Sequence, residues 1–444
     1  MLVVSPFVAY AIWRAVEERR LDRAFDAIEA RGEWLDTASF ELHPSTAEQR
    51  QASHYYAQAM DQVGDDWPPF RTAAKSIEEL CVSTVGDSSR AAALAALRPL
   101  EDHYGAALAL LDRATPLDAW GWDAGDQPRD YGRLLRRARL PWALQLRAAR
   151  LACTGDGDGA AASLIGVLRL RRVPGALLGM TGSPLATRHT LQSLLTFTSP
   201  SATVLERLQH EYQAAIDDRQ LEAGLLVSRA QWLSSALPGE LSDPPSGYLD
   251  RRIGLPEAFL VSLTRPLRSH SILTELAEYD DALAAAKQPW PDKLAAAAAI
   301  ARKYQTFSNT RPRWGIWAAL ASPFGVHAGP RYLAQAAPLA AETLARTRAS
   351  IAALAVARYQ RANGALPATL ADLVPAYLEA PLLDPFTAAP LVYRPDGKRY
   401  KVYSVGINRK DDGGAWDSPS DLQTGRRGNP LDVGIAAGAA AVTR

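Results

Sequence analysis

Few residues in this chain are suited to disulfide or metal chemistry. Its 444 residues include two cysteines, Cys81 and Cys153, and seven histidines. This excludes a disulfide-rich scaffold and a zinc site built from several cysteines. No two histidines have the His-Glu-x-x-His spacing of a zinc-binding helix. The cysteines can form one disulfide or remain buried thiols, and the sequence leaves both alternatives open.

A surplus of charge of either sign is also missing. The chain has 49 basic and 48 acidic residues, a net charge of +1. Proteins that bind nucleic acid usually carry a basic surplus or stripe, so we expect no nucleic-acid partner. Apolar residues make up 48% of the chain and charged residues 22%, which is enough for a large hydrophobic core.

Motifs that identify a catalytic mechanism are absent as well. The sequence has no Gly-x-Ser-x-Gly elbow and no phosphate-binding loop that ends in Lys-Ser or Lys-Thr. An EF-hand read from Asp156 fails, because Ala160 and Val167 stand where oxygen ligands are required. We therefore assign no catalytic residue.

Tryptophan, by contrast, is abundant, with eleven copies. Trp120 and Trp122 lie in the segment WGW, and Trp314 and Trp317 in WGIW. Such residues can line a groove for a polymer substrate, which is the basis for an alternative function as an envelope hydrolase. The other interpretation is core packing, which the usual burial of tryptophan favours.

The N-terminus is apolar over residues 1–13 and then turns abruptly charged. A run of this length is too short to cross a bilayer, which needs about 20 apolar residues. Three interpretations fit this apolar run: a buried helix start, an interfacial anchor, or the remnant of a membrane anchor. We favour the remnant of a membrane anchor. The arginines that follow would keep the next segment in the cytoplasm by the positive-inside rule. A cytoplasmic helical-repeat adaptor is therefore a further alternative.

The region 14–330 predicts a helical body. Two antiparallel helices joined by TGDGDG at 154–159 resemble the unit of a helical repeat, although no second copy occurs at a fixed period. A loop rich in proline and glycine near 238–252 marks a candidate subdomain break. The fold class we expect is mainly α with a small C-terminal α+β module.

That module is predicted over 331–424. A long helix at 331–362 precedes two strand-like segments, 390–394 and 399–405, with an Asp-Gly turn between them. A lone hairpin is marginal in water, so the long helix should pack on an antiparallel hairpin or sheet. The glycine- and alanine-rich end at 425–444 predicts a flexible tail.

The loop after the second strand is rich in oxygen ligands. Calcium binds six to eight oxygens from carboxylates, amides and backbone carbonyls. The residues that could supply them, the last two through backbone carbonyls, are Asn408, Asp411, Asp412, Asp417, Val405 and Lys410. A polar turn is the alternative, because aspartate, asparagine and glycine also favour turns.

Residues 331–421 resemble the C-terminal region of the major pseudopilin of type II secretion systems. The features that carry the resemblance are Tyr359, Asn363, Gly364 and Pro367, the segment 373–378, the run 384–386, and Ser404, Gly406 and Asn408. The resemblance implies a calcium-binding loop at Asn408, Asp411, Asp412 and Asp417. Asn408 stands where the family usually has aspartate, which should weaken the site. The long helix follows some 330 other residues, so pseudopilus assembly is not expected.

The whole layout is also similar to large bacterial envelope proteins with an N-terminal anchor and a helical body. From this we expect a non-enzymatic scaffold attached to the bacterial inner membrane, with a body in the periplasm and protein partners. The expected cofactor is Ca²⁺, and a role near a secretion machine follows from the pseudopilin resemblance.

Overall fold

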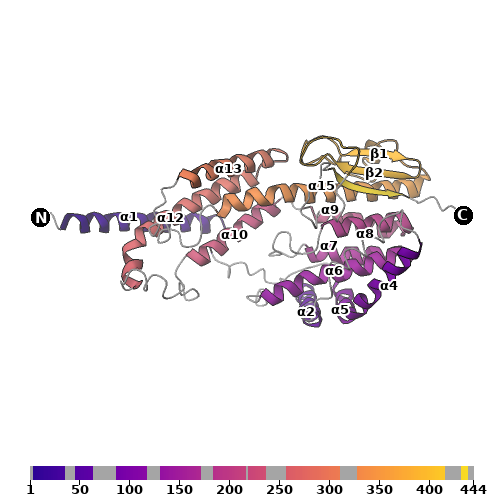
Figure 1. The fold of residues 1–444 in the computed structure, drawn as a ribbon, viewed down its shortest axis with the longest axis horizontal. Helices are drawn as coiled ribbons and strands as arrows, with labels where there is room; N and C mark the ends of the chain where they lie inside the picture. Colours follow the sequence, from indigo (N-terminus) through magenta and orange to yellow (C-terminus); the bar gives the residue numbers. More distant parts are fainter. Residues whose placement is uncertain are drawn as a thin grey trace. The chain divides into compact units, whose positions relative to one another are not determined.

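A computed structural model describes residues 4–35, 46–63, 87–117, 131–171, 184–216, 219–236, 257–310, 328–415 and 432–438. These residues form twelve α-helices and a three-stranded antiparallel sheet near the C-terminus (Figure 1). The predicted class, mainly helical with a C-terminal α+β part, is confirmed. The helices are α1 (Val4–Ala30), α2 (Ala47–Gln62), α4 (Asp87–His103), α5 (Gly105–Ala114), α6 (Tyr131–Cys153), α7 (Gly157–Arg171), α8 (Pro184–Phe197), α9 (Ala202–Ala214), α10 (Gln220–Ala236), α12 (Glu257–Ala286), α13 (Asp292–Thr310) and α15 (Ala328–Asn363).

The chain divides into two compact units, and each combines separate parts of the sequence. The first unit contains Met1–Phe40 and Asp218–Pro338, and the second contains Glu41–Asp217 and Leu339–Arg444. These units do not coincide with the predicted boundaries at 330 and 424. The second unit joins the C-terminal α+β part to α2–α9. The sheet and its long helix share one hydrophobic core with α6–α9, and α2, α4 and α5 pack on α6 and α7 in another core.

In the second unit, α6 and α7 form the predicted antiparallel pair. Gly155, in the turn between them, has a φ of +91°, a conformation that glycine adopts without a steric penalty. The side chain of Asp156 then caps α7 by accepting a hydrogen bond from the Gly159 amide at 2.8 Å. The segment that resembled a calcium loop therefore serves as a helix–helix turn.

A buried ion pair connects three helices of this unit. Arg169 on α7 donates to Glu211 on α9 at 2.6 Å, and both side chains are almost fully buried. Arg169 also donates to the backbone oxygens of Thr115 and Leu117, just after α5. Because the guanidinium is satisfied by several partners, it fixes the end of α5 against α7 and α9.

The sheet has the strand order β1-β2-β3, with β1 (Val392–Asp396), β2 (Arg399–Ser404) and β3 (Val433–Gly438). The predicted hairpin is β1–β2. Strand β3 lies inside the segment predicted as a flexible tail, so that prediction was wrong for residues 433–438. A Cβ atom on Gly434 would lie 2.3 Å from the Val402 carbonyl oxygen, so close strand pairing requires glycine there.

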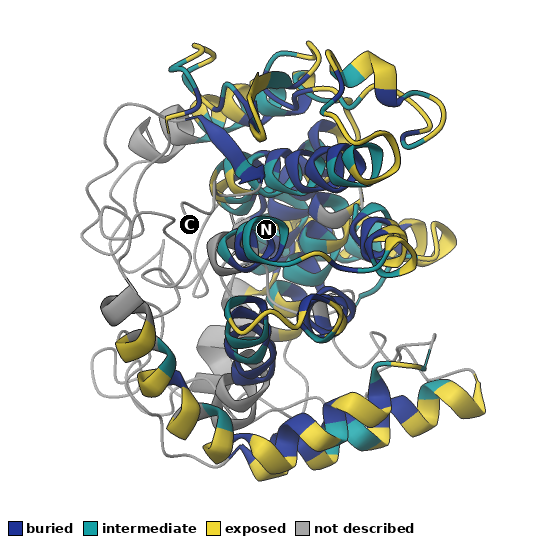
Figure 2. Cartoon of the chain, turned by 90° about the vertical axis from the view of Figure 1, so that its right-hand side faces the viewer, coloured by how far each residue is buried: buried dark blue, intermediate teal, exposed yellow. Residues whose placement is uncertain are grey.

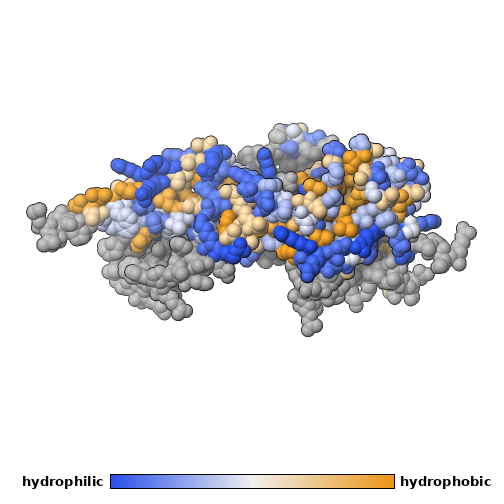
Figure 3. Space-filling model, turned by 90° about the horizontal axis from the view of Figure 1, so that it is seen from above, coloured by the Kyte–Doolittle hydropathy of each residue, from blue (hydrophilic) through white to orange (hydrophobic). Residues whose placement is uncertain are grey.

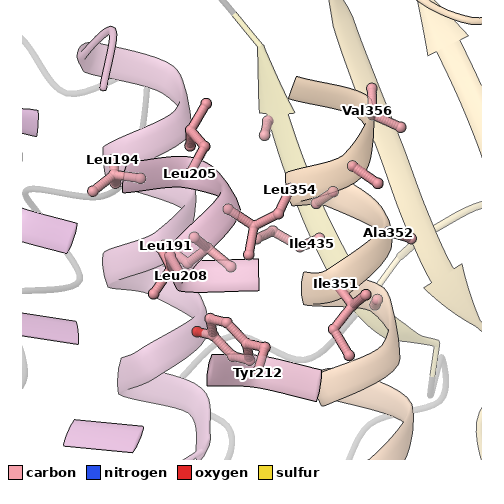
Figure 4. Packing of buried hydrophobic residues seen from close by; sticks show 14 of the residues in the cluster. Leu191, Leu194, Leu205, Leu208, Tyr212, Ile351, Ala352, Leu354, Val356 and Ile435 are labelled. Atoms are coloured by element: carbon pink, nitrogen blue, oxygen red, sulfur yellow. The ribbon is translucent and has the colours of Figure 1, made fainter. Parts of the chain in front are cut away.

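The hydrophobic core that the sheet shares with the helices lies on both sides of α15. One side faces the sheet, where Tyr400 on β2 donates to the Ala353 carbonyl at 2.8 Å. The other side faces α8 and α9, and Leu354 packs towards Leu191 and Leu208 (Figure 4). Figure 2 shows the buried residues along the helices beneath the sheet. The α+β part therefore depends on the helical layers for part of its core.

The first unit contains α1, α10, α12, α13 and the start of α15. Helix α1 is continuous and includes both the apolar N-terminal run and the charged segment after it. Its C-terminal half packs on α12 through Ile28, Ile272 and Leu276. Among the described residues, no helix has both the length and the apolar character that crossing a membrane requires.

Candidate functional site

The loop after β2 lies on the face of the sheet opposite α15. The residues of β2 alternate, so Tyr400 and Val402 face α15, whereas Lys401 and Tyr403 face the loop. A Cβ atom on Gly414 would lie 2.8 Å from the Lys401 side chain and 3.0 Å from the Tyr403 ring. Glycine at this position therefore allows residues 411–414 to lie directly on the strand.

Asp411 is held by three partners. It accepts hydrogen bonds from the Tyr403 hydroxyl at 2.8 Å and the Gly413 amide at 2.9 Å, and it forms an ion pair with Arg394 at 2.6 Å. Desolvation alone would raise the pKa of Asp411. The hydrogen bonds from Gly413, Tyr403 and Arg394 outweigh desolvation and lower that pKa, so this carboxylate is ionised at neutral pH.

Asn408 and Asp412 meet on the other side of the loop. The Asn408 amide donates to Asp412 at 2.8 Å, and the Lys410 backbone amide donates to the Asn408 side-chain oxygen at 3.0 Å. The Val405 amide donates to Asp384 at 2.9 Å, which fixes the start of the loop. The structure thus brings five of the predicted residues into one loop. Asp417 lies outside the described residues.

Asp432 also lies beside this loop, although the sequence did not predict it there. This residue directly precedes β3 and is 2% exposed. One carboxylate oxygen accepts a hydrogen bond from the Gly414 amide at 2.8 Å. The other oxygen, Oδ1, is buried and has no hydrogen-bond partner among the residues that the structure describes. Asp432 was missed because it is 20 residues from Asp412 and lies in a segment predicted as a flexible tail.

The environment of Asp432 disfavours its ionised form. Burial raises its pKa, and the nearby charges of Asp412 and Asp411 act in the same direction. Hydrogen bonds from the backbone amides of Gly414 and Asp412 oppose this shift only in part. The charges of Asp411 and Asp412 therefore act on Asp432 where β2 and β3 meet the loop. Such a group is most stable when a proton or a cation neutralises it.

The loop is not a preformed metal cage. In the described part of the chain, no three side chains of histidine, cysteine, aspartate or glutamate are arranged to hold a metal ion. Asp411 is occupied by Arg394, and Asn408 is bound to Asp412. The buried oxygen of Asp432 that lacks a hydrogen bond is the one feature here that fits a bound cation.

The expected tryptophan groove falls outside the described residues, as do its members Trp120, Trp122, Trp314 and Trp317. So does Cys81, the possible partner of Cys153. A shallow groove does lie between α12 and α13, with Asp281 and Lys303 on its wall. Hydrogen bonds from Lys303 and Tyr304 lower the pKa of Asp281, so it is not poised to act as a general acid near neutral pH.

Comparison of the chain with protein-family models, with curated proteins and with solved structures gives no match.

Proposed function

We propose that this chain is a non-enzymatic scaffold of the bacterial cell envelope, whose pseudopilin-like C-terminal part binds calcium. The observation that carries the calcium site is the buried Asp432 carboxylate, which has one oxygen without a hydrogen bond and lies beside Asp411 and Asp412. The pseudopilin resemblance supports the same ion on independent grounds, through Asn408 and the two aspartates that follow it.

Calcium is the cation that best suits these donors. The loop offers carboxylates, an amide oxygen and backbone carbonyls, which are the hard oxygen ligands that Ca²⁺ prefers. Its flexible glycines also suit a cation that tolerates irregular coordination better than Mg²⁺ does. Asp432 and Asp412 are the carboxylates that we expect to bind the ion, because Asp411 is already paired with Arg394.

The bound ion would have a mechanical role. Asp412 follows β2 and Asp432 directly precedes β3, so an ion between them would join the two ends of this strand pair. Strand β3 has a covalent connection to β2 only through a long segment, and closing such a loop costs entropy. Calcium binding would therefore stabilise β3 in the sheet and, through the shared core, the whole second unit.

Membrane attachment is supported by the exposed N-terminal half of α1. Phe7 is 72% exposed and Ile12 60%, and Figure 3 shows hydrophobic residues at this end of the helix. Trp13 and Tyr10 contact each other edge to face, and both are residue types that favour the membrane–water boundary. The rest of the chain then provides helical surfaces for protein partners.

The test of the calcium site is thermal unfolding of the full chain. The full chain is required because the C-terminal part shares its core with α7, α8 and α9. At a calcium concentration about 100 times the Kd, binding adds about 2.7 kcal/mol. For a unit of this size, that corresponds to a rise in Tm of about 5–10 °C relative to a chelator.

Variants make this test specific. Asp412→Ala should abolish the rise, whereas Asp396→Asn, a change at an exposed carboxylate in the β-hairpin, should leave it intact. Magnesium at the same concentration should have a smaller effect. Equal Tm values in calcium and chelator up to millimolar calcium would refute the ion site.

A further inference from the structure

Charge is distributed unevenly along α1. The exposed apolar turns end at Trp13, and the ten residues that follow include four arginines and three carboxylates. The last seven residues of the helix carry only two charges, Asp26 and Glu29, and both are acidic. At a rise of about 1.5 Å per residue, the four arginines lie within about 15 Å of Trp13 along the helix, whereas Asp26 and Glu29 lie about 20–24 Å away. The basic part of α1 therefore adjoins its apolar turns.

Glu17, one of the three carboxylates, is turned away from solvent. It is buried where α1 packs beside α12 (Figure 1). Arg20 donates to one of its oxygens at 3.1 Å, and His270 of α12 lies 3.6 Å from the other oxygen. The Arg20 side chain remains exposed. Protein thus covers this negative charge, while the arginine that neutralises it still faces solvent.

Glu18 brings a further arginine to the same place. It pairs with Arg14 at 3.0 Å and with Arg265 of α12 at 2.9 Å, and the Arg265 side chain is exposed. One carboxylate therefore neutralises only one of two guanidinium groups. This leaves an excess positive charge directly after the apolar turns.

Arg19 and Arg23 are the least neutralised arginines of this segment. Both are exposed, and neither forms an ion pair with any residue that the structure describes. The Arg23 Nε atom donates to the Arg19 backbone oxygen at 3.1 Å, which leaves the rest of its guanidinium free. Asp22 is exposed beside them and offsets one of the two charges.

These arginines form a ring of charge beside the apolar turns, which we call the arginine collar. Its members are Arg14, Arg19, Arg20, Arg23 and Arg265. Against the carboxylates Glu17, Glu18 and Asp22, the collar has a surplus of two positive charges. An anionic lipid surface raises the affinity for a basic side chain near it by about fivefold, and the effect fades over a Debye length of about 8–10 Å. A neutral lipid surface offers no such attraction.

We propose that the arginine collar binds the phosphate groups of anionic phospholipids while the apolar turns of α1 enter the acyl region. This inference rests on the membrane attachment proposed above and specifies its lipid, one whose headgroup has a net negative charge. The acidic end of α1 supports the same orientation, because repulsion keeps Asp26 and Glu29 away from such a surface.

The experiment measures co-sedimentation of the full chain with two kinds of vesicle. One is pure phosphatidylcholine, and the other is phosphatidylcholine mixed with phosphatidylglycerol. In about 0.1 M salt, binding to the anionic vesicles should be about five- to tenfold tighter, because the surplus of two charges is partly screened. In about 1 M salt the Debye length falls to about 3 Å, and the difference should disappear.

A double variant tests whether the collar is responsible. Arg19→Gln with Arg23→Gln removes the two unpaired arginines, and glutamine has a similar helix propensity. This variant should bind both kinds of vesicle equally, at the level of the native chain on neutral vesicles. Arg98→Gln with Arg113→Gln is the matched control, since it removes two exposed arginines from α4 and α5. The control should keep the native preference.

The possible failures are distinguishable. Equal binding of the native chain to both kinds of vesicle would overturn the inference and leave the membrane attachment standing. Absence of binding to either kind would overturn both. An equal loss of preference in the two double variants would assign the effect to net charge instead of the collar. A preference that Ile12→Asp leaves at its native strength would mean that the collar binds polyanions without insertion, which also rejects the inference.

Discussion

Replacing Asp432 with asparagine should stabilise the protein in the absence of calcium. The carboxylate is 2% exposed, and its Oδ1 atom accepts no hydrogen bond from the described part of the chain, so the ionised form is costly. Asparagine retains an oxygen to accept the hydrogen bond from the Gly414 amide. It also places a donor near the Asp411 and Asp412 carboxylates, where the native side chain adds a third negative charge.

The pH dependence of this effect follows from the sign of the pKa shift. The pKa of Asp432 is raised above its usual value of 3.8 in the folded state. Protonation of Asp432 therefore contributes stability that is fully present below the unfolded pKa and is lost as pH rises through the folded pKa. The advantage of Asp432→Asn over the native chain should be small near pH 3.5 and should reach its full value at neutral pH.

The magnitude follows from the cost of an unsatisfied buried polar group, about 1–3 kcal/mol. For a unit of this size, this corresponds to a Tm about 3–8 °C higher than that of the native chain. The assay is thermal unfolding in chelator from pH 3.5 to pH 8, repeated with calcium, where the order should reverse because asparagine weakens the ion site. A less stable Asp432→Asn variant in chelator would refute this account of the carboxylate.

Three further perturbations test other parts of the structure. Arg169→Met should destabilise the chain by about 3–5 kcal/mol in chemical denaturation, because it leaves the Glu211 carboxylate buried without its partner. Gly434→Ala should cost about 1–3 kcal/mol in the same assay, since its Cβ would lie 2.3 Å from the Val402 carbonyl oxygen. Ile12→Asp should reduce co-sedimentation of the full chain with lipid vesicles, because it places a charge on the exposed apolar half of α1.

Matched variants separate these effects from general damage. Gly105→Ala lies at the start of α5 with no atom within 4 Å of the added Cβ, so it should be neutral or slightly stabilising. If Gly434→Ala were equally harmless, the close pairing of β2 and β3 would be incorrect. Vesicle binding by Ile12→Asp at the native level would argue against a membrane role for α1.

Local patterns in the sequence predicted the elements that depend on near neighbours. The long helix ends at Asn363, one residue beyond the predicted end at 362, and Gly364 adopts a φ of +74° that ends a helix favourably. The sequence also predicted the β1–β2 hairpin and the α6–α7 turn, because a few consecutive residues determine each of them. The sequence could also predict that Asn408, Asp411 and Asp412 lie close together, because they belong to one loop.

Long-range packing determined the rest. Strand β3 has few strand-forming side chains of its own. Its glycines and alanines form a strand because they pair with β2. The division into two units depends on which helices cover α15, and no local pattern specifies that choice. By itself, the sequence therefore determined the helices, the hairpin and the acidic loop. Only the tertiary structure brought Asp432 to that loop, because this contact joins segments that are far apart in the chain.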